Sequence, residues 1–155
     1  MPAEYRARIE AHRPQLHKTA RETYGVEMNP GPFGLQSRPA LIGAKVAEAH
    51  GRGAEFHARV MRAYWEEAQD IEQLSVLAAL AEESGLDAST FMAALREPAY
   101  NAAVEADIEQ ASLYGLSGVP AIVFDNKYLV SGAQPADALR RLADRVLELR
   151  GEPVL

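Results

Sequence analysis

Residues Gly115–Pro135, GLSGVPAIVFDNKYLVSGAQP, decide the fold of this chain. A Gly-Val-Pro triplet at residues 118–120 leads into Ala121–Phe124, an apolar run typical of a β-strand. An Asp-Asn pair follows, and both residue types tolerate the left-handed backbone that a tight hairpin needs. Lys127–Val130 is a second predicted strand, and the proline that ends the stretch suits the first turn of a helix. The stretch therefore predicts a β-hairpin followed by a helix.

The chain before this stretch has helical periodicity. Apolar residues recur at three- and four-residue spacing in segments that glycine or proline residues separate, which predicts a series of helices around a shared core. The expected helices are 3–24, bent or split at Pro14; one capped by Ser37 and reaching about His50; 54–68; one capped by Asp70 and ended by Gly85; a short one begun by Asp87; and one opened by Pro98.

The predicted fold class is mostly α with a small β part. Residues 1–114 form a helical region and residues 115–150 a β-β-α part, and we expect them to pack as one compact domain, as the length of 155 residues suggests. An isolated two-stranded hairpin is marginal in water. We therefore expect the sheet to be incomplete in this chain, with its neighbours supplied by other polypeptide.

Composition and charge exclude several classes of partner. The net charge is −6, and residues 66–109 contain eleven acidic residues against one basic residue, Arg96. A strongly acidic middle disfavours nucleic acid and anionic membranes, which are themselves polyanionic. No segment has the length of a membrane span or the apolar core of a signal peptide. We expect a cytoplasmic protein with no nucleic-acid or membrane partner.

The chain contains no cysteine, so it has no disulfide, no thiolate metal ligand and no thiol nucleophile of its own. Its four histidines do not have the spacing that places two ligands on one helix face, and no phosphate-binding loop or dinucleotide fingerprint occurs. We predict no cofactor, no metal site and no catalytic residue. Arg38, at a helix start after a flexible loop, is a minor candidate for binding a carboxylate.

Two interpretations of Val119-Pro120 remain open from the residues themselves. A proline at the first position of a strand loses no needed hydrogen bond and is an ordinary strand opener. Alternatively the peptide bond is cis, which costs an X-Pro bond only about 0.5–1 kcal/mol. A cis bond would turn the backbone of Val119 outward, where it could pair with an extended peptide. The two short strands and the SGAQP sequence that follow favour the cis form.

Gly115–Pro135 and the segment Met61–Ile71, MRAYWEEAQDI, resemble the DsbA family of thioredoxin-like proteins, in particular its FrnE-like branch. Ser37–Ala40 and Pro98–Tyr100 are similar to runs in the same family. The resemblance extends from about Tyr5 to Leu149 and covers the family's helical insertion and its C-terminal β-β-α unit. The family's N-terminal strand, Cys-x-x-Cys motif, first helix and second strand have no counterpart, so we expect a truncated form of such a protein.

The resemblance implies a protein disulfide oxidoreductase whose redox group is absent here. In complete members the cis-proline loop packs against the cysteine pair and helps to hold the substrate. By resemblance, Gly118, Val119 and Pro120 form a substrate-binding site for an extended peptide or a protein thiol. Because thiol–disulfide exchange requires a thiolate, the chain as it stands is expected to be redox-inactive.

Two other functions remain possible. The chain could be a non-catalytic module that binds peptides or forms a homodimer through an exposed sheet edge. It also resembles the glutathione-dependent branch of the fold, the kappa-type transferases and hydroxychromene-carboxylate isomerases, in which a serine replaces the first cysteine. That serine would lie in the segment without a counterpart, and the SGAQP sequence favours the oxidoreductase branch.

Overall fold

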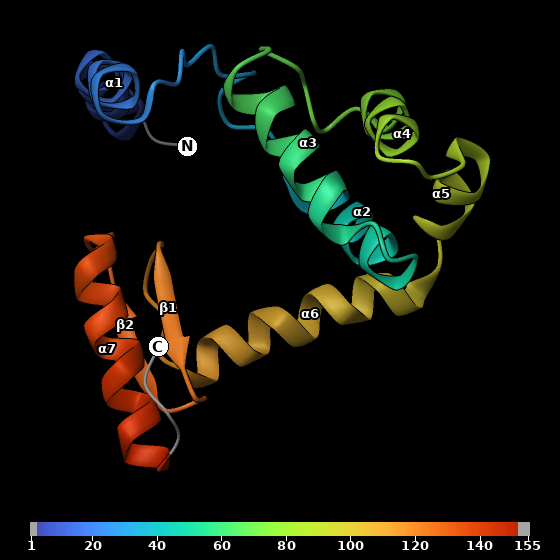
Figure 1. The fold of residues 1–155 in the computed structure, drawn as a ribbon. Helices are drawn as coiled ribbons and strands as arrows, with labels where there is room; N and C mark the ends of the chain where they lie inside the picture. Colours follow the sequence, from blue (N-terminus) through green and yellow to red (C-terminus); the bar gives the residue numbers. More distant parts are fainter. Residues whose placement is uncertain (1–2, 152–155) are drawn as a thin grey trace. The chain divides into compact units, whose positions relative to one another are not determined.

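The computed structural model describes residues 3–151, which form seven helices and one two-stranded sheet (Figure 1). By its internal contacts the chain divides into two compact units, residues 1–105 and 106–155. The division falls inside a helix, whereas the sequence places it after residue 114. The elements are α1 (Ala3–Tyr24), α2 (Arg38–Ala49), α3 (Gly53–Trp65), α4 (Leu74–Glu83), α5 (Ala88–Ala94), α6 (Pro98–Leu113), β1 (Ala121–Phe124), β2 (Tyr128–Ser131) and α7 (Ala136–Arg150).

The predicted fold class, mostly helical with a small sheet, is confirmed. No helix in the described part of the chain combines the length and the apolar character needed to cross a membrane.

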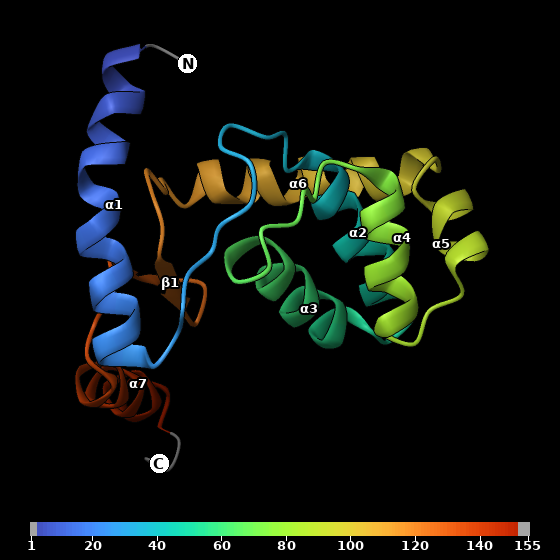
Figure 2. The same ribbon diagram turned by 90° about the horizontal axis from the view of Figure 1, so that it is seen from above.

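The core of the first unit lies among α2, α3, α4 and α5, which pack side by side (Figure 2). Phe56 of α3 and Phe91 of α5 are fully buried, and their ring centroids lie 5.3 Å apart. Gly43 of α2 faces this pair: a Cβ there would lie 2.9 Å from the Phe91 ring and 3.1 Å from the Phe56 ring. The missing side chain therefore lets α2 approach the two aromatic rings closely.

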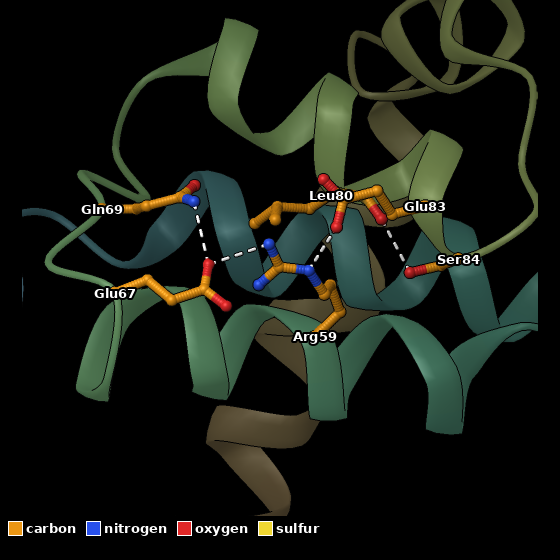
Figure 3. Close-up of polar contacts among 6 residues, drawn as sticks. All are labelled: Arg59, Glu67, Gln69, Leu80, Glu83 and Ser84. Atoms are coloured by element: carbon orange, nitrogen blue, oxygen red, sulfur yellow. Dashed lines mark hydrogen bonds and ion pairs between the residues drawn. The ribbon is translucent and has the colours of Figure 1, made fainter. Parts of the chain in front are cut away.

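A polar network joins α3 to α4 beside this core (Figure 3). The side chain of Arg59 is 17% exposed; its Nη2 donates to Glu67 at 2.9 Å, and its Nε donates to the carboxylate of Glu83. Gln69 donates a further hydrogen bond to Glu67 at 3.0 Å. The hydrogen bond to Glu83 raises the pKa of Arg59, although burial acts in the opposite direction. Arg59 therefore stays charged and connects α4 to the end of α3.

The loop after α1 is fixed to the C-terminal end of α3. The amide of Asn29 donates to the Trp65 carbonyl at 2.7 Å, and the amide of Gly31 donates to the Tyr64 carbonyl at 2.6 Å. A Cβ at Gly31 would lie only 2.3 Å from the carbonyl oxygen of Gln69. Only glycine allows the loop to come this close to the residues that follow α3.

The second unit contains the end of α6, the hairpin and α7. β1 and β2 pair antiparallel, with Phe124 opposite Tyr128. Asp125 and Asn126 have positive φ values of 51° and 54°, the left-handed conformation expected from their residue types. None of the described residues from 106 to 151 is buried.

Several helix details differ from the predictions. α1 runs through Pro14 as one helix (Figure 2). Ser37 lies at the N-cap of α2 but forms no side-chain cap, because its own backbone is helical, with φ −76° and ψ −5°. Asp70 accepts from the amide of Glu72 at 3.0 Å in a local turn, and α4 begins later, at Leu74. Asp87 does cap α5, accepting from the amide of Thr90 at 2.8 Å.

The burial and the hairpin register also correct the predictions at single residues. The three- and four-residue spacing of apolar residues predicts Met61 and Leu74 on the buried faces of their helices, but both side chains are exposed. The second strand begins at Tyr128, one residue later than predicted, because Lys127 belongs to the turn and its amide donates to the Phe124 carbonyl at 3.0 Å.

Candidate functional site

The predicted site loop, Gly118–Pro120, connects the end of α6 to the start of β1. α6 ends in a left-handed glycine, Gly115, with φ 68°, and the amide of Leu116 donates to the Ala111 carbonyl at 3.0 Å. This is a common way to satisfy the last carbonyls of a helix. The helix end therefore directs the chain into the loop.

The loop is exposed and is anchored at its C-terminal side. The Val119–Pro120 peptide bond is cis, and the amide of Gly132 donates to the Pro120 carbonyl at 2.8 Å. Val119 is 95% exposed, which is unusual for a branched apolar side chain. Apart from Gly118 itself and its two chain neighbours, no described residue has an atom within 4 Å of the position that a Cβ on Gly118 would take, so the space above this glycine is open.

The hairpin turn is tied to the ends of both helices of this unit. Tyr114, just after α6, donates from its hydroxyl to Asn126 at 2.9 Å. Arg150, at the end of α7, pairs with Asp125 at 3.2 Å. Both contacts converge on the two residues with left-handed backbone. They hold the hairpin, and with it the start of β1, in a defined position within the unit.

The residue types in the loop limit what it can do. Gly118, Val119 and Pro120 have no titratable or nucleophilic side chain, so the loop can offer only backbone groups and an apolar surface. β1 pairs with β2 and with no other strand among the described residues, which leaves one edge of β1 without a ladder. Such an edge can accept an extended peptide by strand addition.

The other candidate of the sequence, Arg38, is engaged within the protein. Its guanidinium donates to Asn101 at 3.0 and 2.7 Å and pairs with the carboxylate of Glu105. The arginine therefore binds a carboxylate of its own chain and links α2 to α6. In the described part of the chain, no three histidine, aspartate or glutamate side chains are grouped so that they could hold a metal ion.

Solved structures with a similar fold are thiol–disulfide enzymes by name. A "putative protein disulfide isomerase" from Nitrosomonas europaea matches with a TM-score of 0.78 and 27% identity, over 97% of this chain and 78% of that one. A "probable DsbA oxidoreductase" from Streptomyces coelicolor matches with a TM-score of 0.74 and 26% identity, over 99% of this chain and 66% of that one. DsbA from Pseudomonas aeruginosa, at 19% identity and a TM-score of 0.66, covers 89% of this chain and 81% of its own and supports the fold alone.

These matches define the class: a thioredoxin-like fold of the thiol–disulfide oxidoreductases, with a large helical part. The family model of the DSBA-like thioredoxin domain matches residues 2–143, and the chain belongs to that family. The uncharacterized protein YwbO of Bacillus subtilis is 36% identical over 84 residues. That alignment covers 51% of this chain and 40% of YwbO, well under two thirds of the relative's length.

Proposed function

We propose that this chain carries the substrate-holding part of a DsbA-type thiol–disulfide oxidoreductase of the FrnE-like branch. In this proposal Gly118, Val119 and Pro120 hold an extended polypeptide. The observation that supports it best is the exposure of Val119 in the loop just before β1, a strand with one unpaired edge among the described residues. Membership of the DSBA-like family, with its oxidoreductase relatives, supports the assignment of the reaction class.

The binding would rest on backbone hydrogen bonds. Among the described residues, none forms a hydrogen bond with the backbone amide or carbonyl of Val119. An extended peptide could pair with both groups and lie against the exposed valine side chain, as in strand addition. Recognition of this kind is tolerant of sequence, because main-chain groups are common to all peptides. It suits an enzyme that must accept many unfolded substrates.

The redox step requires thiols that this sequence does not contain. Disulfide exchange proceeds by attack of a thiolate on a sulfur atom, and no other side chain can form the mixed disulfide. We therefore infer that these 155 residues bind substrate polypeptides without exchanging their disulfides. Cysteines outside these 155 residues would have to supply the reaction.

Binding of a thiol-free probe tests this proposal. We would add the S-carboxymethylated insulin B chain, an unfolded polypeptide without reactive thiols, and follow backbone amide shifts by NMR. The largest changes are expected at Gly118, Val119 and Ile122. Val119→Pro removes the amide donor and should weaken binding by about tenfold. Val119→Thr keeps the amide and the branched shape and should bind within about threefold of the parent chain.

Three outcomes contradict the proposal. Shifts confined to residues outside 115–132 would place peptide binding elsewhere. Equal affinities of the Val119→Pro and Val119→Thr variants would exclude pairing with the Val119 amide. Saturable shifts of the same loop on addition of glutathione, without a response to the peptide, would instead favour the glutathione-dependent branch.

A homodimer through the sheet edge is a second candidate. The observation that favours it is a sheet of two strands in the described residues, with Tyr128 and Leu129 of β2 still 42% exposed. Two copies could join their edge strands into a four-stranded sheet. Light scattering after gel filtration would show a dimer that Leu129→Lys converts to a monomer. A monomer at all concentrations of the parent chain would exclude this function.

A further inference from the structure

The first unit contains a groove of about 520 Å³ that the predicted site loop does not share. One wall is α1, and the other is formed by the loop after it together with the end of α3. Much of the lining is apolar, with Leu16 on α1, Phe33 in the loop and Trp65 at the end of α3. A cavity of this size is typical of small-molecule sites.

The loop wall is held in place by the hydrogen bonds that join Asn29 and Gly31 to the end of α3. The helix wall is held by contacts with Phe33. The guanidinium groups of Arg6 and Arg13 lie 5.6 and 5.9 Å from the centre of its ring. Cation–π contacts of this kind orient a guanidinium over an aromatic face without neutralising its charge. The groove is therefore a built feature whose walls carry positive charge.

Four basic side chains line the groove, Arg8, His12, Arg13 and His17, and no carboxylate lies among the described lining residues. The hydroxyl of Tyr64, which also lines the groove, donates to the Pro32 carbonyl at 3.4 Å. This contrasts with the chain as a whole, whose net charge is −6. The Nδ1 of His12 is hydrogen-bonded to the Arg8 carbonyl at 2.7 Å, which leaves its Nε2 for another partner. The Nε2 of His17 is buried and has no hydrogen-bond partner in the described part of the chain.

We propose that this groove binds an organic anion with an apolar body, such as a monocarboxylate with an alkyl or aromatic tail. The apolar walls would cover the tail, and the basic groups of α1 would bind the carboxylate. A carboxylate oxygen within reach of His17 would satisfy the imidazole nitrogen that otherwise stays unpaired, and a buried unpaired polar atom is costly. Among the described lining residues, a cation would meet four basic side chains and no acid. The inference is independent of the proposed peptide site.

Trp65 provides a direct readout because it lines the groove and is the chain's only tryptophan. We would titrate the full chain with decanoate, decanol and decyltrimethylammonium, each below its micelle concentration, and follow the tryptophan emission. Isothermal calorimetry would give the stoichiometry. We expect one saturable site for decanoate, with an affinity at least about tenfold higher than for decanol. The ammonium probe should not compete with decanoate. 10-Bromodecanoate should quench Trp65, since heavy-atom quenching requires contact.

Matched variants test the role of the basic groups. Arg13→Gln and His17→Leu should each weaken decanoate binding by about three- to tenfold. Arg96→Gln removes the same charge outside the groove and should leave the affinity unchanged. Leu16→Glu places a carboxylate in the groove at a side chain that is already half exposed, so folding is retained, and it should abolish binding.

The proposal is overturned if decanoate gives no saturable signal by either method. It is also overturned if decanol or decyltrimethylammonium binds as tightly as decanoate, since the basic groups would then not select the ligand. An equal loss of affinity in Arg96→Gln and Arg13→Gln would show a general charge effect and would exclude the groove as the site.

Discussion

The two units bury their apolar residues to very different extents. In the first unit, Phe56 and Leu77 are completely buried, and α2 to α5 enclose a continuous core. In the second unit, none of the described residues from 106 to 151 is buried. The spacing of apolar residues in α7 predicts Leu142 and Leu149 on its buried face, yet they remain 40% and 56% exposed. The helical unit thus closes its own core, whereas the β-β-α unit does not.

The difference follows from how each element hides its apolar surface. An amphipathic helix has one apolar face, which a single neighbouring helix can cover. Four short helices that are close in sequence can therefore bury their apolar faces against each other. β1 presents apolar residues to both faces of a sheet, and among the described residues it pairs with one strand, β2. All four of its residues are only partly buried. A sheet with apolar residues on both faces requires layers on both sides, so this unit is suited to further partners.

The strongest test of this comparison replaces one phenylalanine in each unit by alanine. Phe56→Ala should lower the free energy of unfolding of the first unit by about 3–5 kcal/mol, because a fully buried ring leaves a cavity. Phe124→Ala, in β1, should change the same transition by less than about 0.5 kcal/mol. Urea unfolding followed by Trp65 emission measures the first unit in both variants.

The milder variant Phe56→Leu keeps this test informative if the alanine variant does not fold. It should cost about 1–1.5 kcal/mol. Equal shifts of the Trp65 transition in the Phe56 and Phe124 variants would show that both units unfold as a single cooperative body, contrary to the comparison.

The second test concerns the loop that connects α1 to the core. Gly31→Ala should destabilise the first unit by about 1–3 kcal/mol, because the new methyl would lie 2.3 Å from the Gln69 carbonyl and 2.9 Å from the Tyr64 ring. Gly118→Ala is the matched control from the second unit. Its added methyl would have no atom within 4 Å from the described residues other than Gly118 and its chain neighbours, and the effect should stay within about 0.5 kcal/mol. Similar thermal shifts for the two would refute the close approach at Gly31.

Sequence signals predicted the features that depend on a few neighbouring residues. The left-handed turn at Asp125 and Asn126 and the start of a short helix at Asp87 follow from local chemistry, and both occur. Ser37 and Asp70 failed as caps for a local reason that the sequence does not reveal. The same residue types also form turns, and the backbone angles decide between the two uses.

Features that depend on distant residues could not be predicted. The groove unites the histidines and arginines of α1 with Phe33 and Trp65, which are far away in the sequence. The periodicity of apolar residues does not predict contacts between residues that are distant in sequence. The need for glycine at position 31 follows only from the nearby Gln69 carbonyl in the folded chain. The candidate loop at Gly118–Pro120 could be proposed from the sequence because its three residues form one contiguous motif. Its role as a peptide site stays a prediction.

The third test asks how far polar contacts stabilise the first unit. Arg59→Gln removes the pairs with Glu67 and Glu83 and leaves two carboxylates facing each other, and it should cost about 1–2 kcal/mol. The cost should fall in 1 M NaCl because salt screens the two carboxylates. Arg62→Gln, at an exposed position of the same helix, is the control and should be nearly neutral. If the loss in the free energy of unfolding does not depend on salt, the effect comes from packing of the aliphatic part of the Arg59 side chain and not from its charge.

The smallest expected effect concerns a helix cap that is present in the first unit but has no equivalent at the start of α7 in the second unit. Asp87 caps α5 by accepting from Ser89 Oγ at 2.6 Å and from the Thr90 amide at 2.8 Å, whereas α7 begins after Pro135 with no side-chain cap. The hydrogen bond from Ser89, followed by those from Thr90, lowers the pKa of Asp87 from 3.8 to about 2. The folded state therefore favours the ionised form.

The sign of the pH effect follows from this lowered pKa. The stabilisation is fully present above about pH 4 and is lost as the pH falls through the folded value near 2. Asp87→Asn keeps an oxygen acceptor but cannot ionise, so the parent should have the higher melting temperature near neutral pH, and the difference should vanish toward pH 2. Circular dichroism melts across this range measure it. A difference that is constant with pH would mean that the cap acts through hydrogen-bond geometry alone, so that charge at this position would not distinguish the first unit from the second.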